Sequence, residues 1–156
     1  MRVGSGYDSH RLVGGRRLVL GGVEIPSARG LDGWSDADVI SHAIVDAMCG
    51  AACLGDIGTL FPSGDPRFRD ASSIGLLEVV AGMVVEMGLS VANVDVIVIA
   101  ESPVLSPLVR QMRETLGAAM GVVPERVSVK AKTNEGLGFI GRGEGIVAYA
   151  VVLLEP

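Results

Sequence analysis

Long hydrophobic runs and charged residues are both scarce in this sequence of 156 residues. No stretch of about 18 or more consecutive apolar residues occurs, which excludes an ordinary membrane-spanning helix. Charged residues make up only 20% of the chain and hydrophobic residues 49%. Because this is apolar for one small domain, we expect the surplus apolar surface to lie in contacts between subunits.

The sequence also lacks a signal peptide, since a strand-like segment begins at once, and we expect a cytoplasmic protein. The net charge of −5 argues against a general nucleic-acid binder. It does not exclude an anionic substrate, because metal ions and backbone N–H groups can outweigh net charge locally. Neither the Walker P-loop spacing nor the Rossmann glycine fingerprint occurs.

Cysteine is nearly absent: Cys49 and Cys53 are the only two, four residues apart in a helical pattern. Their side chains would run roughly parallel, which disfavours a disulfide. Two interpretations stay open, namely small core residues in a reducing compartment or a pair of thiolate metal ligands.

The hydrophobic periodicity predicts a single α+β domain covering residues 1–156, with no internal repeat and no linker. Ser35 is the expected cap of the first helix, and 26–33, 54–71 and 134–145 are expected to be loops. The predicted strands are 2–10, 91–100, 126–133 and 146–154, with a hairpin at 18–25 and helices at about 36–53, 72–87 and 107–120. We expect a sandwich of one mainly four-stranded sheet plus the small hairpin, with helices on one face. Neighbouring subunits would bury the open face of the sheet.

The opening strand carries two glycines and two potential metal ligands on one face. Gly4, Gly6, Asp8 and His10 alternate along it, so they point to the same side. The glycines let another element approach the backbone closely. Asp8 and His10 could grip one metal ion, or they could form an ordinary hydrogen-bonded surface pair.

The second histidine, His42, lies in the first long helix, with Asp38 and Asp46 on the same helical face. If this helix packs against the opening strand, Asp8, His10 and His42 form a set of three ligands with an open fourth position. That set is typical of catalytic zinc. The alternative is a helix histidine without a ligand role. Asp46 could orient His42 or remain a solvated carboxylate.

Residues 130–145 leave a strand and pass through five glycines. Lys132 and Thr133 offer a cation and a hydroxyl, Glu135 could hold a divalent cation, and Arg142 could bind phosphate. The alternative is a turn-rich hairpin loop. Two further segments, Asp56–Gly58 and Phe61–Asp65, could hold hydroxyl groups of a ligand, or they could be ordinary turns.

Taken together, four motifs resemble the 2-C-methyl-D-erythritol 2,4-cyclodiphosphate synthase family over essentially the whole chain. They are GSGYDSH at 4–10, SDADV followed by His42, LGDIG with FPSGDP at 54–66, and KAKTNEGLGFIGRGEG at 130–145. The resemblance implies a homotrimer with active sites between adjacent subunits. It implies intramolecular phosphoryl transfer in non-mevalonate isoprenoid biosynthesis: 4-diphosphocytidyl-2-C-methyl-D-erythritol 2-phosphate becomes the 2,4-cyclodiphosphate and CMP. No nucleic acid or membrane takes part.

The resemblance also implies roles for individual residues. Asp8, His10 and His42 would bind zinc or another divalent ion, and Glu135 would bind Mg²⁺ or Mn²⁺. The implied substrate-binding residues are Asp8, His10 and Ser35; Asp56, Ile57, Gly58, Phe61, Pro62, Ser63, Gly64 and Asp65 at the methylerythritol end; Ala100, Pro103, Val104, Leu105, Ser106, Lys132, Asn134 and Glu135 at the cytidine diphosphate end; and Phe139 and Arg142 at the mouth of a cavity on the trimer axis that can hold an isoprenoid diphosphate.

Thr133 and position 34 are the implied catalytic positions, and position 34 is the main departure from the family. The family usually has a histidine there, assigned to transition-state stabilisation, whereas this chain has Trp34. Tryptophan donates one N–H but carries no charge, so it could serve instead as packing under the substrate loop. A second departure is Val104, where a lysine is common.

The departures leave three interpretations. The first is an active cyclodiphosphate synthase, in which the nucleophile is a phosphate of the substrate itself. The second is a catalytically impaired trimer that still binds metal and isoprenoid diphosphate. The third is a zinc hydrolase acting on another phosphate ester through a water nucleophile.

Overall fold

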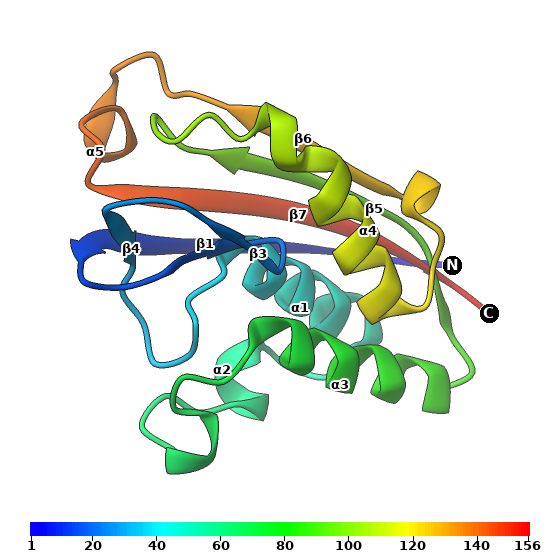
Figure 1. Cartoon of the computed structure of the whole chain (residues 1–156). Coiled ribbons are helices and arrows are strands. Elements are labelled where there is room, and N and C mark those ends of the chain that lie inside the picture. The colour runs from blue at the N-terminus through cyan, green and yellow to red at the C-terminus, as the bar shows by residue number, and fades with distance from the viewer.

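The computed structural model describes residues 1–156 as one mixed sheet with helices packed on one of its faces (Figure 1). Five strands form the sheet in the order β4-β1-β7-β5-β6, so β4 and β6 are its edges. All neighbouring strands are antiparallel except β5 and β6, which are parallel. The strands are β1 (Arg2–Gly14), β4 (Arg29–Leu31), β5 (Ser90–Ile99), β6 (Val127–Lys132) and β7 (Gly145–Glu155).

The α+β class, the helix-covered face and the small hairpin are confirmed, whereas the four-stranded sheet is wrong. The predicted hairpin is β2 (Leu18–Leu20) paired with β3 (Val23–Ile25). The fifth sheet strand, β4, lies in the predicted loop 26–33 and pairs with an extension of β1 to Gly14. This pairing turns the chain back beside residues 12–14, the part of β1 that follows Asp8 and His10.

Three long helices cover the sheet: α1 (Val39–Ala52), α3 (Ser73–Glu86) and α4 (Val109–Met120). Two helices of four residues, α2 (Ile57–Leu60) and α5 (Gly138–Gly141), lie in segments predicted as loops. Short 3₁₀ turns occupy Pro66–Phe68, Ser106–Leu108 and Pro124–Arg126. No helix has the length and apolar character needed to cross a membrane.

The glycine face of β1 is the face that meets α1. A Cβ at Gly4 would overlap the Ala47 carbonyl oxygen, and one at Gly6 would overlap the Ala43 carbonyl oxygen. Glycine at both positions therefore lets the helix backbone rest directly on the strand. This close approach brings the first turns of α1, which carry His42, to the middle of β1, which carries Asp8 and His10.

Asp38, not Ser35, caps α1. Its buried carboxylate accepts hydrogen bonds from the Ile40 and Ser41 N–H groups and from the Ser41 hydroxyl. It also accepts from the N–H groups of Gly21 and Gly22 in the turn between β2 and β3, at 2.9 and 2.8 Å. One carboxylate thus fixes the helix start against the hairpin, because a buried charge must be fully hydrogen-bonded.

The two cysteines differ in environment, although both are free thiols. Cys49 is buried in the core, where burial raises the pKa of its thiol to about 11. Cys53 is exposed at the end of α1 in the left-handed conformation. Neither belongs to a group of metal-ligating side chains. The core-residue interpretation therefore holds for Cys49 alone.

Candidate metal centre and active site

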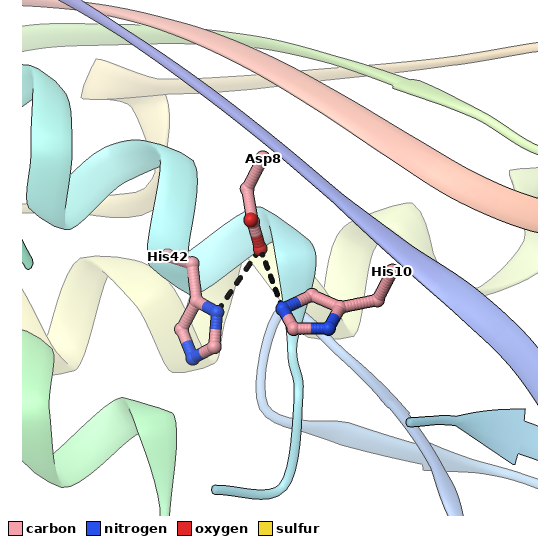
Figure 2. A group of neighbouring side chains, drawn as sticks. All are labelled: Asp8, His10 and His42. Atoms are coloured by element: carbon pink, nitrogen blue, oxygen red, sulfur yellow. Dashed lines mark hydrogen bonds and ion pairs between the residues drawn. The ribbon is translucent and has the colours of Figure 1, made fainter. Parts of the chain in front are cut away.

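Asp8, His10 and His42 form the one group of three or more histidine, cysteine or carboxylate side chains that could hold a metal ion. Asp8 Oδ2 lies 3.1 Å from His10 Nε2 and 3.0 Å from His42 Nδ1. Figure 2 shows both rings turned toward the same carboxylate oxygen. The ligand atoms all lie within 4.8 Å of one another, so the predicted meeting of β1 and α1 is confirmed.

The outward nitrogen of each ring also has a polar partner. His10 Nδ1 donates to the Asp32 carbonyl oxygen. His42 Nε2 lies 2.8 Å from Ser73 Oγ and 3.1 Å from Ser35 Oγ. Partners of this kind fix ring orientation in metal sites and leave the inner nitrogen free to ligate.

The charges of the group support one another. Burial opposes ionisation of Asp8, but hydrogen bonds from His10 and then His42 outweigh it, so the pKa of Asp8 lies well below its ordinary value. Burial likewise opposes protonation of His10, but the hydrogen bond and the charge of Asp8 raise the pKa of His10. Asp8 and His10 thus each favour the charged form of the other.

This donor set fits a divalent transition metal. One carboxylate oxygen and two imidazole nitrogens are the ligand types that zinc takes at catalytic sites, with one coordination position left open. The three side chains open into a pocket of about 210 Å³, so a ligand could reach an ion held there.

The pocket brings together half of the residues predicted for the methylerythritol end. Trp34, Ser35, Ile57, Gly58, Phe61 and Ser63 line it together with the three potential metal ligands. Phe68 and Leu76 complete the lining, and neither was predicted. They follow from the approach of the 3₁₀ turn and of α3, which sequence periodicity does not encode.

The predicted residues Asp56, Pro62, Gly64 and Asp65 do not line the pocket. Asp56 caps α2, accepting hydrogen bonds from the Thr59 N–H and hydroxyl at 2.7 and 2.8 Å. Asp65 caps the 3₁₀ turn and pairs with Arg67 at 2.7 Å. Both carboxylates therefore shape the loop that borders the pocket.

Asp46 does not orient His42. Its carboxylate accepts a hydrogen bond from the Ile57 N–H at 2.8 Å and so holds the start of α2. Neither prediction for Asp46, an orienting group or a solvated carboxylate, describes this role.

Trp34 is half-exposed and uses its one N–H within the protein. Nε1 donates to the Asp65 carbonyl oxygen at 2.8 Å, which ties the indole to the loop 61–65. The Trp34 carbonyl in turn accepts from the Asp70 N–H at 2.8 Å. Trp34 thus joins the loop 61–65 to the segment before α3, while its role towards a substrate remains a prediction.

Arg16 is a residue that the sequence did not single out. Its guanidinium donates to the carbonyl oxygens of Leu31, Gly33 and Ser35 at 3.1, 3.2 and 2.6 Å. The segment that it holds supplies the Asp32 carbonyl to His10 and the Ser35 hydroxyl to His42. One planar fork therefore supports the partners of both histidines.

The residues predicted for the cytidine diphosphate end gather in a second pocket of about 140 Å³. Ala100, Pro103, Val104, Leu105, Ser106, Lys132 and Thr133 line it, with Glu101 and Ala131. The two pockets share no lining residue within one chain. The two sets of predicted residues therefore line separate pockets within one chain.

Asn134 and Glu135 follow directly after this second pocket. Glu101 accepts from the Asn134 N–H at 2.7 Å and so holds the turn. Glu135 has a left-handed φ of 52°, and its carboxylate accepts from the Thr133 hydroxyl at 2.8 Å. No second histidine, cysteine or carboxylate cluster accompanies Glu135.

Phe139 and Arg142 lie apart from both pockets. Phe139 borders a surface hollow that also includes Ser9, Arg11 and Glu144. The Arg142 guanidinium is exposed, and its Nε pairs with Glu144 at 2.6 Å.

Comparison with known proteins identifies the family of this chain. The model of the YgbB family matches residues 1–155. The chain belongs to the YgbB family. A relative from Symbiobacterium thermophilum, named 2-C-methyl-D-erythritol 2,4-cyclodiphosphate synthase, is 59% identical over 99% of this chain and 98% of its own length.

Solved structures of the YgbB fold superpose closely on this chain. A CDP complex from Plasmodium falciparum is 34% identical, with a TM-score of 0.87 over 99% of this chain and 96% of that one. A bifunctional protein from Campylobacter jejuni is 40% identical, with a TM-score of 0.94 over 98% of this chain. This chain spans 42% of the length of that bifunctional protein.

Proposed function

We propose that this YgbB-family chain is a metal-dependent cyclodiphosphate synthase. Its substrate would be 4-diphosphocytidyl-2-C-methyl-D-erythritol 2-phosphate, and its products 2-C-methyl-D-erythritol 2,4-cyclodiphosphate and CMP. The observation that carries this proposal is the Asp8, His10 and His42 group in a pocket lined by the predicted substrate residues. The name shared by its relatives supports the same reaction.

The proposed reaction asks little of protein nucleophiles. The 2-phosphate of the substrate attacks the β-phosphorus, CMP leaves, and a ring closes. A phosphate monoester has its second pKa near ~6, so the attacking group is already largely ionised at neutral pH. The protein has to fold the substrate so that its ends meet, which can supply about 7–11 kcal/mol of the barrier in favourable cases.

The side chains divide this work. Asp8, His10 and His42 would hold a divalent ion, zinc in our proposal, and Glu135 would hold Mg²⁺ or Mn²⁺. Both ions would supply Lewis-acid stabilisation of phosphoryl oxygens. Ser35 and the loop 56–65 would hold the methylerythritol end. Lys132, Asn134 and the turn 100–106 would hold the diphosphate and cytidine. The Thr133 hydroxyl, which donates to Glu135 in this structure, would turn to donate to the transferring group once Glu135 holds the ion.

We further propose a homotrimer with each active site between adjacent subunits. Its support is the sheet face opposite the helices, where Val3, Tyr7 and Tyr149 are exposed, and Tyr7 pairs directly with Tyr149. The two pockets that share no residue within one chain would then meet across an interface. An isoprenoid diphosphate on the trimer axis, near Phe139 and Arg142, and a cytoplasmic location belong to the same proposal.

Product analysis tests the activity. The purified chain, given substrate and divalent metal, should release one CMP for each cyclic diphosphate formed. Phosphorus NMR measures both products. A linear product that incorporates labelled oxygen from water would instead indicate a hydrolase. Metal binding without CMP release would indicate the impaired binding protein that the replacement at Trp34 suggests.

A further inference from the structure

The outer edge of the His42 ring is held by a series of hydrogen bonds that runs from the buried Ser73 hydroxyl to the partly buried carboxylate of Asp36. His42 Nε2 lies 2.8 Å from Ser73 Oγ, and Ser73 Oγ is hydrogen-bonded in turn to Asp36 Oδ1. Asp36 Oδ2 also accepts from the Ser73 N–H at 3.0 Å. One carboxylate therefore holds both the backbone and the hydroxyl of Ser73, at the first residue of α3.

The donor and the acceptor of each of these hydrogen bonds can be assigned. An ionised carboxylate only accepts hydrogen bonds, and a serine hydroxyl has one hydrogen to give. Asp36 accepts from the Ser73 N–H and the Asp38 N–H as well, an environment that suits a carboxylate. The Ser73 hydrogen therefore points to Asp36, and Ser73 Oγ faces His42 as an acceptor. A contact of 2.8 Å then requires a hydrogen on His42 Nε2.

We propose that Asp36 and Ser73 are positioning residues that hold His42 with Nε2–H turned outward, so that Nδ1 is presented to the metal ion. This inference rests on the metal site of the proposed function, and it does not depend on the cyclisation reaction. Asp36 then does more than hold the start of α3. Its charge makes Ser73 donate to it, and Ser73 in turn accepts from His42 Nε2.

Loss of these hydrogen bonds leaves His42 Nε2 with a partner that does not fix which of the two atoms carries the hydrogen. Without the Ser73 hydroxyl, Nε2 retains only Ser35 Oγ at 3.1 Å, and Ser35 can donate as well as accept. The neutral ring can then keep its single hydrogen on Nδ1, where it donates to Asp8, and leave Nε2 without one. Loss of such outer partners typically weakens metal binding about 10- to 100-fold.

Two variants test the proposal by zinc affinity, measured by competition with a chromophoric chelator. Ser73→Ala removes the hydroxyl but retains the backbone N–H that donates to Asp36. Asp36→Asn preserves the shape and replaces an acceptor with a group that can donate to Ser73. We expect both variants to bind zinc about 10- to 100-fold more weakly than the parent.

Ser41→Ala is the matched control. Ser41 is also a fully buried serine, and its hydroxyl donates to a buried carboxylate, Asp38, at 2.7 Å. It makes no hydrogen bond to His42. This variant should lose stability while its zinc affinity stays within about threefold of the parent. If Ser73→Ala and Ser41→Ala bind zinc equally well, Ser73 is merely structural and the proposal is wrong.

Nitrogen NMR of the zinc-loaded parent gives a second readout that needs no variant. Because the chain has only two histidines, the ring signals of His42 can be assigned without overlap. We expect a hydrogen-bonded, slowly exchanging Nε2–H on His42 and no hydrogen on Nδ1. A zinc-loaded parent whose His42 ligates through Nε2 would overturn the proposal. An enzyme inactive in CMP release that still shows this signal would overturn only the proposed reaction.

Discussion

The ring centroids of His10 and His42 lie 5.4 Å apart, with the ring planes inclined at 61°. One ring comes from the first strand and the other from the first long helix, so the site exists only while β1 and α1 stay in contact. The packing of these two elements and the chemistry of the site are therefore coupled.

The ranking of two substitutions tests the assignment of roles. His42→Ala removes a metal ligand and should lower kcat/KM about 100-fold or more, because several kcal/mol of charge stabilisation are lost. Trp34→His should change turnover less than this, since the indole N–H is already given to Asp65. Steady-state CMP release measures both, and the opposite ranking would contradict the roles given to these residues.

Gly6→Ala tests the contact between β1 and α1. The added methyl group would overlap the Ala43 carbonyl oxygen and push the helix away from the strand. We expect a loss of about 1–3 kcal/mol in the free energy of unfolding, together with weaker metal binding. Gly14→Ala in the same strand is the control, because a Cβ there meets nothing within 4 Å. Equal urea midpoints for the two variants would refute the packing argument.

The stability of the metal-free chain should depend on pH in two directions. The pKa of Asp8 is lowered from 3.8, so its contribution is present above that value and is lost as the pH falls below it. The pKa of His10 is raised from 6.5, so its contribution is present below that value and is lost as the pH rises through the higher folded value. Urea unfolding in chelator should therefore show greatest stability between these limits.

Zinc should remove the alkaline part of this dependence, because the ion takes the place of the proton on the ligating nitrogen. Asp8→Asn should flatten both limbs in the metal-free chain. A parent profile that matches the Asp8→Asn profile would show that the pair contributes nothing to folding.

Arg16→Met tests the support of the loop 31–35. The methionine keeps the apolar stem but loses the donors to the Leu31, Gly33 and Ser35 carbonyls. We expect kcat/KM to fall about tenfold, equivalent to one charged hydrogen bond, and Arg16→Lys should restore little, because an ammonium lacks the planar fork. Arg17→Met is the matched control, since Arg17 is exposed and pairs only with Glu24. Equal losses in the two methionine variants would argue against a role for Arg16.

The grouping of Asp8, His10 and His42 could be predicted from the sequence because each residue lies in a strong local pattern. Alternation placed Asp8 and His10 on one face of a strand, two glycines on that face predicted a close neighbour, and helical spacing placed His42. The only further assumption was that the helix packs on the glycine face, and this is what the structure shows.

The segments that were missed are too short for periodicity to reveal. β4 has three residues, includes a glycine and follows Pro26, so its sequence is that of a loop. Gly30 is needed there because a Cβ would overlap the carbonyl oxygens of Arg16 and Arg17, a tertiary constraint. α2 is a single turn whose start depends on Asp46 from another helix. The start of the helix predicted at about 72–87 agrees with α3, which begins at Ser73, but the contact of Ser73 with His42 depends on how α3 meets α1.

The edge strand β6 has a consequence for how copies of this chain can associate. Lys130 and Lys132 are exposed on this short strand, and Lys130 is held by Asp95 at 2.7 Å. Lysines on a short border strand discourage another chain from extending the ladder of backbone hydrogen bonds. Growth into open-ended fibres through this edge is thereby opposed, which leaves the sheet face with Tyr7 and Tyr149 as the surface for the trimer that we propose.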